Sequence, residues 1–312
     1  MKPFWILGLV GLTLLGAATA AQGAGDMATA PGLAPQPGGG LQPVITTSEL
    51  VVGPNRLAFG LLKEYQLLDE ADVVVRVYEL HGQQAQWQAQ TRARYARLES
   101  VEHGQRMHVH PDGIRHVHNE TTDVQGIYVT QVTFERPGPW GFEVFVRQGD
   151  GPAEVVRFTI NVLAAPHTPM PGTPAPRSHN LIASDVKDMR QIDTSDPPDP
   201  RLHQVRIAEA IAQGRPQIIV FATPKFCTSR ICGPVVDIVR TLLPAYGERV
   251  VFTHQEIWQD AAMHELFPTV AEWGLQTEPW IFVVDGQGII RAKFEGLTTA
   301  REIEAVLRQV LE

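Results

Sequence analysis

The chain has 312 residues, a formal net charge of −8 and two cysteines, Cys227 and Cys232. Its length suggests two domains, and its acidic balance, with no basic run, argues against nucleic acid as a partner. Apart from an apolar run near the N-terminus, no segment has the length and hydrophobicity of a membrane span.

Residues 1–20 predict a secretory signal peptide. Lys2 precedes the apolar run from Phe4 to Leu15, and Ala18, Thr19 and Ala20 form a suitable cleavage site. Without cleavage, the same run would be an N-terminal anchor that tethers the protein to a membrane. Either alternative places the rest of the chain outside the cytoplasm (secreted, periplasmic or at the cell surface), where disulfides persist.

Two stretches rich in proline, glycine and alanine divide the remaining chain. Residues 21–44 include three consecutive glycines and predict a tether, while residues 165–200 contain eight prolines and predict an extended interdomain linker. The expected folded domains are therefore residues 45–164 and 201–312.

Residues 45–164 predict an all-β domain. Roughly eight short runs of β-forming residues are separated by turn signals, without a helical pattern. The stretch from Gly126 to Trp140 resembles the late strands of immunoglobulin-like sandwiches in bacterial extracytoplasmic proteins, some of which handle copper. The expected fold of this domain is an immunoglobulin-like β-sandwich.

One hairpin of this domain is rich in histidine. A three-residue loop at Pro111, Asp112 and Gly113 would pair His110 with Ile114 and His108 with His116. Side chains alternate along a strand, so the histidines would then share one face, where they could bind copper or zinc. A two-residue loop would instead separate them into pairs on opposite faces, and the site would not form. Alternatively, the histidines are only polar surface residues of an edge hairpin. The candidate ligands are His108, His110, His116 and His118.

The two cysteines lie between an apolar run at Ile218 to Phe221 and an amphipathic helix expected to begin near Pro234. In a regular helix their separation would give roughly 7.5 Å of axial rise, more than the ~4.4–6.8 Å between Cα atoms that a disulfide accepts. For the two to bond, Cys227 must lie in a loop, with Cys232 before or at the helix start. A thiolate there would face free N–H groups, which lower its pKa.

The rest of residues 201–312 has a mixed α/β pattern. A short helix is expected at Ile207–Ala212, a strand at Val250–Phe252 and a hairpin from Trp280–Val284 and Ile289–Phe294. A final helix would open with a capping box formed by Thr299 and Glu302.

Residues Phe221 to Cys227 and Glu278 to Gly288 resemble the cysteine loop and the cis-proline strand of thioredoxin-like proteins, and the resemblance covers about residues 200–312. It implies an α/β thioredoxin-like fold, a redox pair at Cys227 and Cys232, and a cis Pro279 against the disulfide. In that family the backbone before the proline is free to pair with a substrate peptide. The motif departs from the family in having four residues, instead of two, between the cysteines. Cys232 can alternatively be aligned with the first cysteine of the family, with Val235 replacing the second.

Three functions are compatible with these features. The first is an extracytoplasmic thiol-disulfide oxidoreductase that acts on thiols or disulfides of partner proteins and requires no cofactor. The second is a copper metallochaperone, since the wider cysteine spacing also resembles copper-delivery proteins of oxidase assembly; His254 is the candidate remote ligand. The third is a binding module in which the disulfide is a structural staple. We expect the oxidoreductase, with catalytic residues Cys227, Cys232 and Pro279.

Overall fold

The computed structural model describes residues 40–64, 66–82, 84–98, 106–109, 115–118, 124–227, 229, 231–260 and 262–312. The expected signal peptide and most of the expected tether lie outside these residues, although residues 42–44 of the tether belong to the first strand. Among the residues that the structure describes, no helix is both long enough and apolar enough to cross a membrane.

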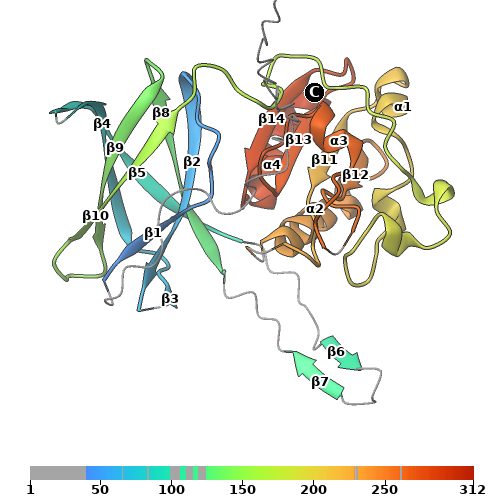
Figure 1. The fold of residues 1–312 in the computed structure, drawn as a ribbon, viewed down its shortest axis with the longest axis horizontal. Coiled ribbons are helices and arrows are strands. Elements are labelled where there is room, and N and C mark those ends of the chain that lie inside the picture. The colour runs from blue at the N-terminus through green and yellow to red at the C-terminus, as the bar shows by residue number, and fades with distance from the viewer. Residues whose placement is uncertain are drawn as a thin grey trace, which may run out of the picture.

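The first part of the described chain forms one eight-stranded sheet, ordered β1-β2-β8-β5-β4-β9-β10 with β3 paired to β2 (Figure 1). Its long strands alternate between buried and outward residues, which is the pattern of a sheet with one covered face. The strands are β1 Gln42–Ile45, β2 Gly53–Lys63, β3 Gln66–Leu67, β4 Asp72–His81, β5 Gln84–Arg97, β8 Gly126–Phe134, β9 Gly138–Arg147 and β10 Glu154–Val162.

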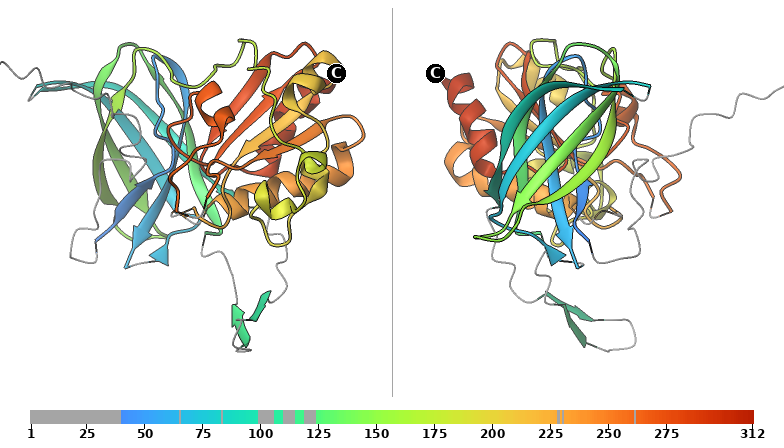
Figure 2. Two further views of the ribbon diagram at one scale, coloured as in Figure 1. Left: turned by 45° about the vertical axis from the view of Figure 1, so that its right-hand side comes forward. Right: turned by 90° about the vertical axis from the view of Figure 1, so that its left-hand side faces the viewer.

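This sheet curls until its two edges nearly meet (Figure 2). Strand β5 pairs first with β4 and then, through Arg94–Arg97, with β8, so one strand joins both halves of the sheet. At the other side, Leu163 donates its N–H to the carbonyl of Leu50 (2.8 Å) and accepts from the N–H of Val52 (3.3 Å). The enclosed core is aromatic, and the rings of Phe142 and Phe158 stack at 4.9 Å.

The C-terminal part contains a four-stranded mixed sheet of order β12-β11-β13-β14, in which only β11 and β12 are parallel. Helices α2 and α4 cover one face of this sheet, where they pack against Ile218 and Val220 of β11. On the other face, Ile219 and Phe221 belong to the cluster that contains Trp273. The elements are α1 Ile207–Ala212, β11 Gln217–Phe221, α2 Cys232–Tyr246, β12 Val251–Gln255, α3 Pro268–Glu272, β13 Trp280–Val284, β14 Ile290–Glu295 and α4 Ala300–Leu311.

The fold class expected from the sequence, an immunoglobulin-like sandwich followed by an α/β thioredoxin-like fold, is wrong. The structure is mostly β, with 40% strand and 19% helix, and its large sheet is nearly closed and barrel-like instead of split into two layers. Alternating burial occurs in sandwiches and barrels alike, so the pattern could not show that β5 continues from one half into the other. Of the four α-helices in the described part of the chain, α1 and α3 have only 6 and 5 residues, so strands dominate there.

The proline-rich segment 165–200, expected as an extended linker, packs along the C-terminal sheet. Its backbone bonds to the edge of β14, where the N–H of Gly172 donates to the carbonyl of Ile290 at 2.8 Å. Three short 3-10 helices follow at Ala183–Asp185, Met189–Gln191 and Pro200–Leu202. The segment also buries polar side chains, including Ser178, Asn180 and Asp193. The segment is therefore part of the folded structure that packs around the C-terminal sheet.

A buried carboxylate joins the two parts of the chain. Glu295, at the end of β14, accepts the N–H groups of Ser48 and Glu49, each at 2.8 Å, and the hydroxyl of Thr277 at 2.7 Å. Burial outweighs these bonds and raises the pKa of Glu295 above its ordinary value. Nearby, Arg56 of β2 pairs with Glu302 of α4 at 2.8 Å. These contacts set the barrel-like sheet against the end of the C-terminal sheet.

Candidate functional site

Cys227 and Cys232 form a disulfide with their Cα atoms 6.1 Å apart. As expected, Cys227 lies in the loop after β11, while Cys232 is the first residue of α2, which begins two residues before the expected Pro234. The loop bends back on itself, because the N–H of Cys227 donates to the carbonyl of Thr223 at 3.0 Å. This turn keeps Cys227 out of the helix and brings the two sulfurs together.

The two sulfurs differ in access. Cys232 is 0% exposed and belongs to the core between α2 and the C-terminal sheet. Cys227 is 8% exposed, and its Sγ lies 3.1 Å from the hydroxyl of Ser229. Cys232 also occupies the helix start, where unpaired N–H groups and the helix dipole favour a thiolate. Of the cations considered near the pair, Lys225 is exposed, and Arg230 lies outside the described residues.

A carboxyl group stands next to the disulfide. A carboxylate oxygen of Glu278 and the two cysteine sulfurs all lie within 4.8 Å of one another. Glu278 accepts the N–H of Thr223 at 2.9 Å, which holds it against the loop that carries Cys227. Burial, which outweighs the hydrogen bonds from Thr223, raises the pKa of Glu278 to about 7. This carboxyl group can therefore gain or lose a proton near neutral pH.

The peptide bond between Glu278 and Pro279 is cis, as expected. Pro279 leads directly into β13, whose first residue Trp280 pairs with Phe221, the last residue of β11. The structure thus brings three parts of the candidate site together at the same end of the C-terminal sheet: the cysteine loop, Glu278 and Pro279.

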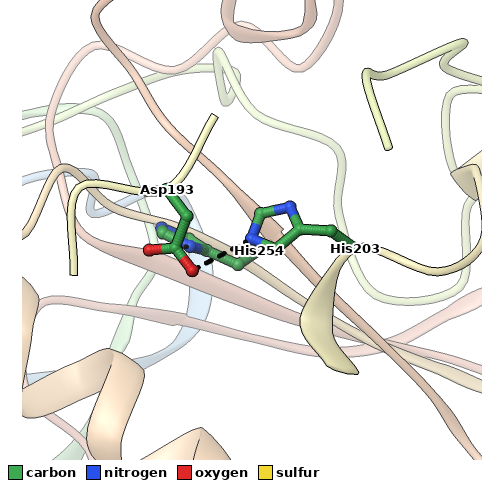
Figure 3. A group of neighbouring side chains, drawn as sticks. All are labelled: Asp193, His203 and His254. Carbon is green, nitrogen blue, oxygen red and sulfur yellow. Dashed lines mark hydrogen bonds and ion pairs between the residues drawn. The ribbon is translucent and has the colours of Figure 1, made fainter. Parts of the chain in front are cut away.

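A second group of polar side chains is buried beside β12. Asp193, His203 and His254 each offer one ligand atom, and these atoms lie within 4.8 Å of one another (Figure 3). Nε2 of His203 lies 3.2 Å from Oδ2 of Asp193, and Nδ1 of His254 lies 3.4 Å from Oδ1. Glu256 is close by, with Oε1 3.9 Å from Nε2 of His254.

Burial acts differently on the members of this group. It lowers the pKa of His203, whereas contact with Asp193 outweighs burial and raises the pKa of His254. Burial also raises the pKa of Glu256. The pKa of Asp193 is lowered, because hydrogen bonds from its neighbours outweigh burial.

Sequence reasoning missed this group. Asp193 lies in the segment expected as an extended linker and His203 follows it, while the sequence suggests His254 only as a remote copper ligand. In the structure His254 is completely buried in β12, and His203 pairs with Thr253 through an isolated bridge along that strand. No spacing pattern connects residues 10 and 61 positions apart in the chain, so only the tertiary structure brings them together.

The copper hypothesis requires His254 to lie close to the two cysteine sulfurs. Its Nε2 donates to the carbonyl oxygen of Ala222, 2.9 Å away, and its Nδ1 faces Asp193. Its ring nitrogens belong to the group with Asp193 and His203, not to the group with the cysteines. His254 is therefore not placed as a third ligand for the cysteine pair.

The histidine hairpin is described only in part. Strands β6 Arg106–Val109 and β7 Arg115–His118 pair antiparallel, with His108 opposite His116 as the three-residue loop predicts. His110 and the loop lie outside the described residues. The metal site at His108, His110, His116 and His118 stays a prediction.

No protein-family model matches this chain, and no curated protein matches its sequence.

Proposed function

We propose that the protein is a thiol-disulfide oxidoreductase that exchanges disulfides with partner proteins outside the cytoplasm. The observation that carries the proposal is the setting of the Cys227–Cys232 disulfide. Cys227 is 8% exposed and Cys232, which is 0% exposed, begins a helix, while a carboxyl group with a pKa of about 7 lies within 4.8 Å of both sulfurs. A disulfide that served only as a staple would need no such neighbour.

Cys227 is the less buried of the two cysteines, so its sulfur is the one that we assign to the contact with a partner. When the protein acts as an oxidant, a partner thiolate attacks Sγ of Cys227, so that a mixed disulfide forms and the Cys227–Cys232 bond breaks. Cys232 leaves as a thiolate at the start of α2, where the helix dipole and free N–H groups stabilise the negative charge. A stable leaving thiolate speeds this step.

Glu278 supplies the proton. In its neutral form it donates the carboxyl proton to the Cys232 thiolate, which restores a thiol and leaves a carboxylate that solvent reprotonates. A second partner thiolate then attacks the partner sulfur of the mixed disulfide and releases Cys227. Two electrons pass from the partner to the cysteine pair. The reverse sequence, in which Cys227 attacks a partner disulfide and Cys232 resolves the product, makes the protein a reductant. Neither direction requires a cofactor.

The test is to trap the mixed disulfide. Cys232→Ser removes the resolving thiol, and we expect it to accumulate a covalent complex with a dithiol or disulfide protein substrate that reductant releases. Cys227→Ser is the matched control and should trap little, because Cys232 is 0% exposed. Equal trapping by the two variants would refute the assignment of Cys227, and no trapping by either would refute the exchange activity.

The reduction potential separates exchange from a structural staple. For the wild-type pair, thiol trapping in redox buffers should give a potential of roughly −120 to −270 mV, the range of known oxidoreductases. A potential below about −300 mV would mean a structural bond.

Copper binding by the reduced pair is a second candidate function, because two thiolates and the Glu278 carboxylate form a compact donor set. Soft thiolates favour Cu(I). Repeating the thiol-trapping measurement with one equivalent of copper distinguishes the two: protection of the reduced pair by copper supports metal delivery, and an unchanged titration supports exchange.

A further inference from the structure

The cluster of Asp193, His203 and His254 has the donor set of a metal site. Two imidazoles and a carboxylate are ligands that Zn²⁺ commonly takes. The side chains of all three residues are 0% exposed. Burying this many polar groups is costly unless each one is paired or binds a cation.

In the neutral form of His254, the hydrogen bond of its ring leaves the lone pair of Nδ1 for a metal. Its Nε2 lies 2.9 Å from the carbonyl oxygen of Ala222, which can only accept, so Nε2 carries a hydrogen. Its Nδ1 is buried, and among the described residues it has no hydrogen-bond partner. A metal-binding histidine typically donates its other ring N–H to a backbone carbonyl in the same way, which fixes the tautomer and the ring.

The candidate ligand atoms lie within 4.8 Å of one another, near the separations found around one metal ion. With metal bonds of about 2.0–2.2 Å, two ligand atoms of a tetrahedral zinc site lie about 3.3–3.6 Å apart. Nε2 of His203 lies 3.2 Å from Oδ2 of Asp193, and Nδ1 of His254 lies 3.4 Å from Oδ1, so each nitrogen lies close to this separation from a different oxygen of the carboxylate. The second distance exceeds the usual 2.7–3.2 Å of an N–H···O hydrogen bond.

The carboxylate is held in place by the backbone. Oδ1 of Asp193 accepts the N–H of Ser195 at 2.9 Å, and Oδ2 accepts the N–H of Asp199 at 2.8 Å. His254 is fixed by its place in β12, and His203 by its bridge to Thr253 on the same strand. The carboxylate of Asp193 and the ring of His254 are therefore oriented by groups that do not depend on the ion.

We propose that Asp193, His203 and His254 bind one zinc ion that fastens the proline-rich segment to β12. The site is structural, since it is closed to solvent. It also adjoins the cysteine loop, because the carbonyl of Ala222, which accepts from His254, precedes the N–H of Thr223, which donates to Glu278. The proposal does not depend on the thiol-exchange activity.

The experiment must exclude the other candidate metal ligands. We would use the full chain with the four hairpin histidines replaced by asparagine and with the cysteine pair kept oxidised, so that neither the hairpin nor free thiolates can bind metal. The folded protein is purified from zinc-supplemented and from zinc-depleted medium, and its zinc content is measured by mass spectrometry together with its Tm. We expect about one zinc per chain and a higher Tm for the zinc-grown protein, since a ligand that binds only the folded state stabilises it.

Two variants and a second metal complete the test. His203→Ala should lose the zinc, whereas the control His264→Ala, at an exposed histidine, should keep it. Growth with Co²⁺ should give the intense visible absorption of a tetrahedral site, which is read from the parent protein even if His203→Ala fails to fold. A folded parent protein that contains no zinc and shows no such absorption would overturn the proposal. Equal zinc in His203→Ala and the parent would do the same.

Discussion

Replacing Glu278 by glutamine tests the physical basis of the redox site through stability. The pKa of this carboxyl is about 7 in the folded protein, against 4.5 for an ordinary glutamate. At 1.36 kcal/mol for each pKa unit, this difference corresponds to about 3 kcal/mol. The folded state binds the proton more tightly than the unfolded state between these two pH values. This contribution to stability is therefore complete below pH 4.5 and is lost as the pH rises through 7.

Glu278→Gln removes this titration and keeps an acceptor for the N–H of Thr223. We expect the difference in unfolding free energy between variant and wild type to move in favour of the variant by about 3 kcal/mol from pH 4 to pH 8. Taking the difference between the two pH values cancels any effect of the substitution that does not depend on pH. Urea unfolding of the oxidised protein, followed by circular dichroism at several pH values, measures it.

The matched control is Glu248→Gln, which changes an exposed carboxyl group after α2. It should leave the pH profile of stability close to that of the wild type. If Glu278→Gln followed the wild-type profile as closely as the control does, burial would not be shifting the Glu278 carboxyl. Its role as the proton donor to Cys232 would then lose its support.

Three further predictions concern the redox pair, the junction at Glu295 and the core of the barrel-like sheet. At pH 8, Glu278→Gln should make the potential of the cysteine pair less negative, because an amide does not oppose a nearby thiolate; an unchanged potential in thiol trapping would contradict this. Glu295→Ala should cost about 1–3 kcal/mol in urea unfolding, because the N–H groups of Ser48 and Glu49 lose their acceptor; wild-type stability would show that this junction contributes little. Phe142→Ala should cost about 3–5 kcal/mol by opening a cavity beside Phe158, and a loss under about 1 kcal/mol would mean that the core collapses around the gap.

Local sequence patterns predicted the elements around the cysteines well. The apolar run at Ile218 to Phe221 lies in β11, and the final helix opens with the capping box of Thr299 and Glu302. The disulfide limit on Cα separation placed Cys227 in a loop and Cys232 at a helix start, as observed. Each of these features depends on residues close together in the chain, where periodicity, capping and chain geometry act directly.

Sequence patterns predicted the overall architecture less well. The predicted sandwich was wrong because alternation reports which side chains are buried, not which strand each strand pairs with. In the structure β5 continues from its pairing with β4 into a pairing with β8, which makes the sheet nearly closed. The prolines of residues 165–200 predicted an extended path, but their composition carried no sign that the segment would pack against β14 and β12.

The sequence by itself determined the chemistry available to this protein: one pair of cysteines at a strand-to-helix junction, a proline before a strand, and a hairpin rich in histidine. Only the tertiary structure decided which groups meet. It placed Glu278, partly buried, beside the disulfide, and it brought Asp193, His203 and His254 into one buried cluster. The reason is physical, since contact and burial between distant residues depend on how the sheets and the proline-rich segment pack, and this packing has no local signature in the chain.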